Sequence, residues 1–212
     1  MAVLTVRAVQ KFVQTQNGRQ RLYLSAEDRL TPAARDWLQT EGVEITPKPH
    51  EKPEHMTHLR AGELVPKTHP VIEFRGMLDL LQSEILLCGS YAAGKIRNDL
   101  NELLAVTRRI MRCQVLEESW TAEMICGFTP EQLREQSHRP DEYFGQGHFV
   151  PEISDDQMLL RLNRLRTIIR KTELTAQRAI PERKDLILVL NRLSSLVWIW
   201  IIRLKKEQTH GL

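Results

Sequence analysis

The sequence predicts a mainly α-helical protein: a helical bundle of four to five long helices that carries a small N-terminal α/β appendage. Long amphipathic segments follow one another from residue 71 to about residue 208, with apolar residues at the spacing of a helix face. The first 45 residues instead contain short strand-like runs and turn residues. With 212 residues, the chain is long enough to bury a sizeable core.

The composition is typical of a soluble globular protein without a disulfide framework. A hydrophobic content of 42% with 27% charged residues is ordinary for a soluble globular protein, and a net charge of +3 does not argue for nucleic acid. The cysteines Cys88, Cys113 and Cys126 show no C-x-x-C spacing, so they indicate neither a disulfide framework nor a zinc ribbon. The first residues lack the apolar core of a signal peptide. We therefore expect a cytoplasmic protein.

Residues 1–45 are predicted to form the small α/β unit. Strand-like runs at residues 4–9 ("LTVRAV") and 21–25 ("RLYLS") flank Asn17-Gly18, a dipeptide typical of a β-hairpin turn.

A short helix follows in "TPAARDWLQTEG". Thr31 is the expected N-cap, Pro32 occupies the first helical position and Gly42 lies just past the end. Residues 46–70 are rich in Pro, His and Lys, which predicts a long loop between two units.

The remaining residues, 71–208, are predicted to form the bundle domain. Short helices near residues 129–136 and an irregular segment with Gly and Pro lie between the second and third long helices, and Ser154 or Asp155 is expected to cap the third. The long helices are expected at residues 71–87, 95–116, 155–179 and 183–206.

The last helix contains the run "LNRLSSLVWIWIIRL". A bilayer span needs about 20 apolar residues, and this run is interrupted by polar and charged residues, so we expect no membrane span. Asn191, Ser194, Ser195 and Trp198 share one helix face at i, i+3, i+4 and i+7. A polar strip inside an apolar helix must be hydrogen-bonded. Its partner is either a neighbouring helix or a ligand.

The third long helix carries a charged stripe. Arg166, Arg170 and Glu173 lie at i, i+4 and i+7, with Lys171 beside them. Two guanidinium groups on one stripe can grip a polyphosphate. The alternative is a solvated ion-pair face of the kind common on helices.

Two of these segments resemble a known family. "LRTIIRKTE" and, about twenty residues later, "LNRLSSLV" are similar to the A-R-T-x-x-R-R-A-E and L-N-R-L-S-D patterns of corrinoid adenosyltransferases of the propanediol-utilisation type. "VPKTHPVIEFRGMLDLL" resembles the first helix of that family. The blocks "LSAEDRLTPAARDWL", "THLRAGELVPKTHP", "RRIMRCQVLEE", "GFTPEQLREQSHRPDEYF" and "HFVPE" are similar to its ethanolamine-utilisation branch, and this second resemblance covers nearly the whole chain.

The resemblance implies an ATP:cob(I)alamin adenosyltransferase that transfers the 5′-deoxyadenosyl group of ATP to the reduced cobalt of a corrinoid, forming adenosylcobalamin for ethanolamine catabolism. ATP, Mg²⁺ and cobalamin would be its small molecules. Arg166 and Asp79 match an arginine and an aspartate that pair across a subunit boundary, and with Arg170 they are the implied catalytic residues.

The same resemblance implies a set of binding residues. Phe149 matches the aromatic side chain that excludes the lower axial ligand of the corrinoid, with Phe144 or Tyr143 as alternatives. The implied ATP-binding residues are Lys67, Lys171, Glu173, Asn191 and Arg192.

Assembly and location also follow from the resemblance. It implies a homotrimer, with a dimer as the alternative, in the cytoplasm and associated with a bacterial microcompartment. Ethanolamine ammonia-lyase or microcompartment proteins are the implied protein partners, and no nucleic acid or membrane is expected.

The chain also departs from the family pattern. The N-terminal T-R-T-G-D-x-G phosphate loop is absent, and the last Asp of N-R-L-S-D is Ser195. Enteric members of the ethanolamine branch carry a Cys-Cys-x-x-Cys cluster in the loop before "THL", whereas this loop has His50, His55 and His58 but no cysteine. We therefore expect no metal site in the loop.

The rival prediction is a non-enzymatic helical bundle that binds a protein or RNA. Arg108, Arg109 and Arg112 in "TRRIMR" would form its basic patch, but no aromatic residues are interleaved with them.

Overall fold

The computed structural model describes residues 3–16, 18–25, 27–47, 53–60, 63–121 and 124–210. The chain divides into two compact units, Met1–Glu54 and His55–Leu212. Each unit has a hydrophobic cluster of its own.

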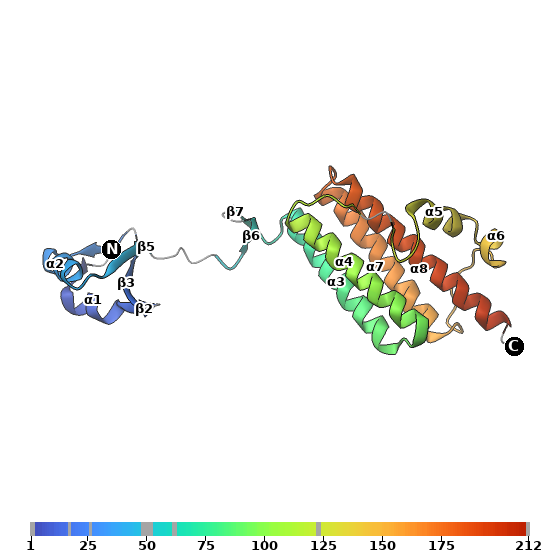
Figure 1. The fold of residues 1–212 in the computed structure, drawn as a ribbon, viewed down its shortest axis with the longest axis horizontal. Helices are drawn as coiled ribbons and strands as arrows, with labels where there is room; N and C mark the ends of the chain where they lie inside the picture. The colour runs from blue at the N-terminus through green and yellow to red at the C-terminus, as the bar shows by residue number, and fades with distance from the viewer. Residues whose placement is uncertain are drawn as a thin grey trace. The chain divides into compact units, whose positions relative to one another are not determined.

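The first unit is a small α/β structure (Figure 1). Three strands form a sheet in the order β2-β3-β5, in which β2 pairs antiparallel and β5 parallel with β3. A second, two-stranded sheet pairs β1 with β4. The elements are β1 (Val3–Leu4), α1 (Val6–Phe12), β2 (Gln14–Gln16), β3 (Arg19–Leu24), β4 (Arg29–Leu30), α2 (Pro32–Thr40) and β5 (Glu44–Pro47).

The hairpin position and the short helix of this unit were predicted correctly, although the first strand of the hairpin is β2 and not the run at residues 4–9. β2 and β3 pair on either side of residues 17–18, although Asn17 itself lies outside the described residues. Thr31 Oγ1 accepts from the Ala34 N–H at the start of α2, and Gly42, with φ +65°, follows its end.

The strand predicted at residues 4–9 is wrong, because α1 occupies most of it. Val6, Val9 and Val13 recur at helical spacing and contact the cluster of this unit, in which Val9 is fully buried. Packing of this apolar face therefore overrides the β-propensity of the valines.

The second unit begins with a hairpin inside the stretch expected as a loop. β6 (Met56–Arg60) and β7 (Glu63–Pro66) pair antiparallel. Arg75 Nη2 donates to the Leu59 carbonyl oxygen over 3.1 Å, which ties this hairpin to the bundle.

Four long helices form the bundle and lie side by side in Figure 1. Their bounds agree with the predicted segments to within a few residues, and the fold class is confirmed. Two short helices, α5 (Pro130–His138) and α6 (Pro140–Phe144), precede an irregular segment at residues 145–156. The long helices are α3 (Pro70–Tyr91), α4 (Gly94–Val115), α7 (Gln157–Ala179) and α8 (Lys184–His210).

Neither of the two predicted caps of α7, Ser154 and Asp155, is the observed one. Asp156 is the N-cap, and its Oδ1 accepts from the Met158 N–H over 2.7 Å. Asp155 instead accepts from the Glu152 N–H and pairs with Lys205 of α8, so its carboxylate anchors the 145–156 segment to the bundle.

α8 is the core helix of the bundle. It is long and apolar enough to cross a membrane by length and composition alone, but 61% of its most apolar window is buried inside the protein. Leu190, Leu193 and residues 196–202 of α8 all belong to the hydrophobic cluster. The apolar residues are thus explained by packing against the other helices.

Candidate functional site

A pocket of about 460 Å³ opens between α7 and α8, and we call it the α7–α8 pocket. α7 contributes Asn163, Arg166 and Arg170, and α8 contributes Asn191, Ser194, Ser195 and Trp198. The rest of the wall comes from the end of α5 (Ser137 and His138) and from the 145–156 segment (His148, Phe149, Val150 and Pro151).

The helical repeat explains why these side chains meet. Arg166 and Arg170 are four residues apart on α7, and Asn191, Ser195 and Trp198 follow at i, i+4 and i+7 on α8, so each set lies on one face of its helix. The two faces line the same pocket. The two stripes predicted separately from the sequence therefore meet at one pocket, with the exception of Glu173, which lies outside its lining.

Arg166 is the most constrained cation in the pocket. Its Nε is buried and has no hydrogen-bond partner among the described residues. Burial lowers the pKa of Arg166 below its ordinary value, and the nearby charge of Arg170 adds to the effect. A buried donor without an acceptor is costly, so Arg166 is suited to an anionic group from outside this chain.

Asn191 is held in place by two charged neighbours. Its Nδ2 donates to Glu173 Oε1 over 3.2 Å, and its Oδ1 accepts from Arg192 Nη1 over 2.8 Å. Arg192 Nε is buried without a partner in the described part of the chain, and burial is the main cause of its lowered pKa. Glu173 and Arg192 do not line the pocket themselves; they orient Asn191, which does.

Aromatic side chains form the apolar part of the pocket. The Phe149 ring lies 5.4 Å from the Trp198 ring, centroid to centroid. Phe144 lies outside the pocket lining, with its ring 5.1 Å from the guanidinium carbon of Arg203. Of the two phenylalanines predicted for the corrinoid, Phe149 is the one in the pocket.

Besides Glu173, Arg192 and Phe144, three further predicted site residues do not line the α7–α8 pocket. Lys67 is exposed between β7 and α3, Asp79 is exposed on α3, and Lys171 is exposed on α7. The carboxylate of Asp79 makes no ion pair within the described residues. The Ser83 hydroxyl donates to the backbone carbonyl oxygen of Asp79 and not to its carboxylate.

The histidine loop is only partly described. His50 lies outside the described residues, whereas His55 and His58 are both exposed. No group of three or more His, Cys, Asp or Glu side chains is arranged to hold a metal ion in the part of the chain that the structure describes.

Sequence reasoning missed several residues of the pocket. His148 stands directly before Phe149, and Asn163 precedes Arg166 by three residues on the same helix face, so helical spacing could have found Asn163. Ser137 and His138 reach the pocket through tertiary packing of α5 on α8, which no sequence spacing signals.

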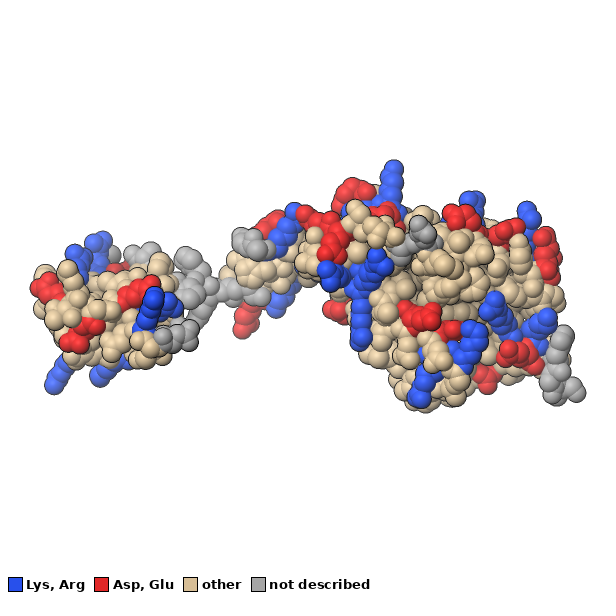
Figure 2. All heavy atoms as spheres, in the orientation of Figure 1, with Lys and Arg blue, Asp and Glu red and all other residues tan. Residues whose placement is uncertain are grey.

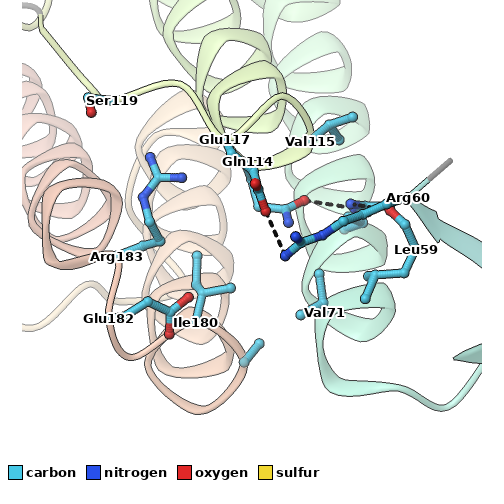
Figure 3. A pocket seen from close by; sticks show the side chains of 12 residues that line it. Leu59, Arg60, Val71, Gln114, Val115, Glu117, Ser119, Ile180, Glu182 and Arg183 are labelled. Atoms are coloured by element: carbon cyan, nitrogen blue, oxygen red, sulfur yellow. Dashed lines mark hydrogen bonds and ion pairs between the residues drawn. The ribbon is translucent and has the colours of Figure 1, made fainter. Parts of the chain in front are cut away.

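A second pocket, of about 430 Å³, lies where the β6–β7 hairpin meets the bundle (Figure 3). Arg75 donates to Gln114 Oε1 over 2.7 Å and to the Leu59 carbonyl, and Arg60 pairs with Glu117 at 2.6 Å. These contacts join the hairpin to α3 and to the end of α4. We interpret this pocket as a structural junction.

The arginines of the predicted basic patch are largely engaged within the chain. Arg112 makes a bidentate pair with Glu118, and Arg109 donates to Thr121 Oγ1 and lies over the Trp120 ring. On the face of the molecule in Figure 2, basic and acidic side chains are interspersed. The rival RNA-binding prediction therefore gains no support from this surface.

Comparison with known proteins identifies the family. The chain is 30% identical to the corrinoid adenosyltransferase EutT of Salmonella typhimurium and 28% identical to that of Escherichia coli K12, in each case over 85% of this chain and 84% of the relative.

Two solved structures show the same fold. Both are variants of the PduO-type ATP:corrinoid adenosyltransferase from Lactobacillus reuteri, one complexed with cobalamin and ATP and one with ATP. Each is 18% identical to this chain and covers 73% of it, with TM-scores of 0.56 and 0.57, and the match covers 91% and 92% of the respective neighbour. The sequence pattern of cobalamin adenosyltransferases matches residues 49–204, and the chain therefore belongs to the cobalamin adenosyltransferase family.

Proposed function

We propose that this enzyme is an ATP:cob(I)alamin adenosyltransferase whose reaction takes place in the α7–α8 pocket. One observation carries the assignment of the site. The pocket sets Arg166, Arg170 and Asn191 beside the Phe149 and Trp198 rings. Guanidinium and amide groups suit the phosphates of ATP, and aromatic rings suit the apolar face of a corrin macrocycle.

The reaction is a displacement at C5′ of ATP. The electron pair of the reduced cobalt forms the cobalt–carbon bond, while the C5′–O bond breaks and its electron pair leaves with triphosphate. No proton has to move, so the residues of the chain act by position and charge. Arg166 and Arg170 would stabilise the charge that develops on the leaving triphosphate.

Mg²⁺ is proposed to enter as a complex with ATP. The described wall of the α7–α8 pocket contains no carboxylate, and the nearby Glu173 accepts from Asn191 and Gln177. Mg²⁺ commonly takes its ligands from substrate phosphates and water, with few protein groups. The donor set fits that mode of binding.

A homotrimer would complete the site, with a dimer as the alternative. In this proposal Asp79 of one subunit pairs with Arg166 of the next, and Lys67 approaches ATP from the same side. Asp79 is exposed beside apolar side chains of α3 that are also exposed, which suits an interface. These are Leu80, Leu86, Leu87 and Tyr91.

We place the reaction in ethanolamine catabolism, because the blocks of sequence that resemble the ethanolamine-utilisation branch span nearly the whole chain. The cytoplasm, in association with a microcompartment, is the proposed location. Ethanolamine ammonia-lyase or microcompartment proteins are the proposed protein partners.

An anaerobic assay with ATP, Mg²⁺, hydroxocobalamin and a chemical reductant tests the proposed function. We expect the absorption spectrum of an alkylcobalamin to develop and to disappear on exposure to light, which cleaves the cobalt–carbon bond. Reactions without ATP are the control. If the spectrum stays that of the reduced corrinoid at high enzyme concentration, the proposed function is wrong.

A further inference from the structure

The imidazole of His148 lies beside the indole of Trp198 in the α7–α8 pocket. Trp198 Nε1–H donates to His148 Nδ1 over 3.3 Å, and the two rings are nearly parallel, at 9°, with their centroids 5.9 Å apart. Trp198 is only 7% exposed, and a buried indole N–H needs an acceptor. Among the described residues, His148 Nδ1 is that acceptor.

Trp198 connects two parts of the proposed site. The Phe149 ring of the 145–156 segment packs on it at 5.4 Å, and the guanidinium carbon of Arg166 lies 4.7 Å from the centroid of its ring. Contacts on a ring face tolerate sliding and rotation, whereas a hydrogen bond from Nε1 is directional. The bond to His148 is therefore the contact that fixes how the indole is turned.

We propose that His148 is a positioning residue for adenosyl transfer. By accepting the hydrogen bond from Trp198, it holds the indole in one orientation and so fixes the Phe149 ring and the Arg166 guanidinium relative to each other. This inference rests on the proposed function, in which Phe149 faces the corrinoid and Arg166 faces the triphosphate. In-line displacement requires the two substrates to be aligned, so the spacing of these two side chains bears directly on the rate.

The first test uses the full chain without substrate. His148→Phe keeps an aromatic ring but removes the acceptor, whereas His148→Asn keeps an acceptor close to the position of Nδ1. In protein labelled with ¹⁵N-tryptophan, the Trp198 indole resonance is identified by its absence in Trp198→Phe. We expect His148→Phe to shift this resonance and to speed exchange of its proton with water, and His148→Asn to lie nearer the wild type.

The control for this spectrum is His58→Phe, which changes an exposed histidine of β6 and should leave the Trp198 resonance in place. An unchanged resonance and an unchanged exchange rate in His148→Phe would overturn the proposal.

The second test measures rates. In His148→Phe we expect kcat to fall about tenfold, with the KM for ATP within about twofold of the wild type, because the lost contact aligns the substrates and does not bind ATP. His148→Asn should recover most of the loss. In the Trp198→Phe background the His148→Phe change should have no further effect, because the donor is already gone.

A purely structural role would lower the unfolding midpoint of both His148 variants without this separation of kcat from KM. Equal losses in the Phe and Asn variants, or losses that add fully in the double variant, would contradict the proposal.

The two tests separate this inference from the function on which it rests. If wild-type protein forms no cobalt–carbon bond, the proposed function and the role of His148 in transfer both fall, while the resonance shift still establishes the hydrogen bond. If the wild type is active and the resonance does not respond to His148→Phe, only the inference about His148 falls.

Discussion

Arg166 and Arg192 each bury an Nε that has no partner among the described residues. Folding would not retain such donors for stability, because an unsatisfied buried donor costs about 1–3 kcal/mol. Arg166 lines the α7–α8 pocket together with Asn191, and Arg192 donates to the Asn191 side chain. At the scale of single residues, Arg166 in the pocket and Arg192 behind Asn191 thus each keep a donor that a ligand or a second subunit can satisfy.

We expect Arg170→Ala and Asn191→Ala each to lower kcat/KM for ATP by about one to two decades, since a charge-assisted contact is worth about 1.5–3 kcal/mol. Arg170 is exposed, so its removal should change the free energy of unfolding little. Steady-state kinetics and urea unfolding measure the two effects.

Arg178→Ala is the matched control, because Arg178 is also an exposed arginine of α7 but lies outside the pocket. Wild-type kinetics in well-folded Arg170→Ala and Asn191→Ala would contradict the ATP-binding role and favour the alternative, a solvated ion-pair face.

The histidine-containing loop leads to a second expectation at this scale. With Mg²⁺ in excess, activity should survive treatment with a chelator selective for transition metals, because the loop lacks the thiolates that hold zinc or iron tightly. Activity would be followed by the cobalt–carbon spectrum before and after chelation. Activity that is lost on chelation and restored by Zn²⁺ or Fe²⁺ would refute this expectation.

At the scale of elements, hydrophobic periodicity predicted every long helix of the bundle. The residues that cap these helices were predicted less accurately. α3, α4, α7 and α8 were predictable because long apolar stripes at helical spacing override local detail. α1 was mistaken for a strand, because seven residues are too few for the period to outweigh β-branched valines. Asp155 and Asp156 are both good N-caps, and tertiary pairing with Lys205 decided which of them caps α7.

The turn from α7 into α8 is held by Asp185, and its charge makes stability depend on pH. The side-chain hydrogen bonds from Arg183 are the main cause that lowers the pKa of Asp185 from 3.8 to about 2, and the Trp120 N–H contributes. A carboxyl whose pKa is lower in the folded state stabilises the protein above its unfolded pKa, and this contribution is lost as the pH falls through the folded value.

We therefore expect part of the free energy of unfolding to disappear between about pH 4 and pH 2. Asp185→Asn should flatten this part of the curve and lower stability at pH 7 by about 1–2 kcal/mol, a figure reduced for partial exposure. Urea unfolding across this pH range measures both. Parallel curves for the variant and the wild type would show that another carboxyl is responsible.

At the scale of the whole molecule, the α7–α8 pocket could be foreseen only in part. The stripes on α7 and α8 were visible in the sequence because both follow the helical repeat. Ser137, His138 and His148 reach the same wall from α5 and an irregular segment, and no local pattern encodes such an approach.

Substitutions that remove or exchange the charges of Asp79 and Arg166 test the proposed subunit boundary. Asp79→Ala and Arg166→Ala should both lose activity and loosen the assembly, because removing one member of a pair buried at an interface costs about 3–5 kcal/mol. Exchanging the two charges in one double variant should restore part of the assembly. Light scattering would measure the mass of the assembly, and activity assays on the same samples would measure the loss of function. A fully active monomer would contradict the proposed subunit boundary.

The division at Glu54 and His55 gives a further expectation. Because each unit buries its own hydrophobic cluster, a chain that begins at residue 55 should fold, with a thermal midpoint within a few degrees of the bundle transition of the full chain. Calorimetry on both chains measures this. A shorter chain that is unfolded or aggregated would show that the bundle depends on residues 1–54.

α8 is one unbroken helix of 27 residues, about 40 Å long at 1.5 Å per residue. Asp185 holds the loop at Trp120, Asn191 and Trp198 line the pocket, and Lys205 anchors the segment that carries Phe149. Inserting or deleting one residue in a helix turns everything beyond it by about 100°. A change of one residue in length between Asp185 and Lys205 would therefore turn at least one of these side chains away from its partner. Within α8, we expect single-residue insertions and deletions to be tolerated only beyond Lys205.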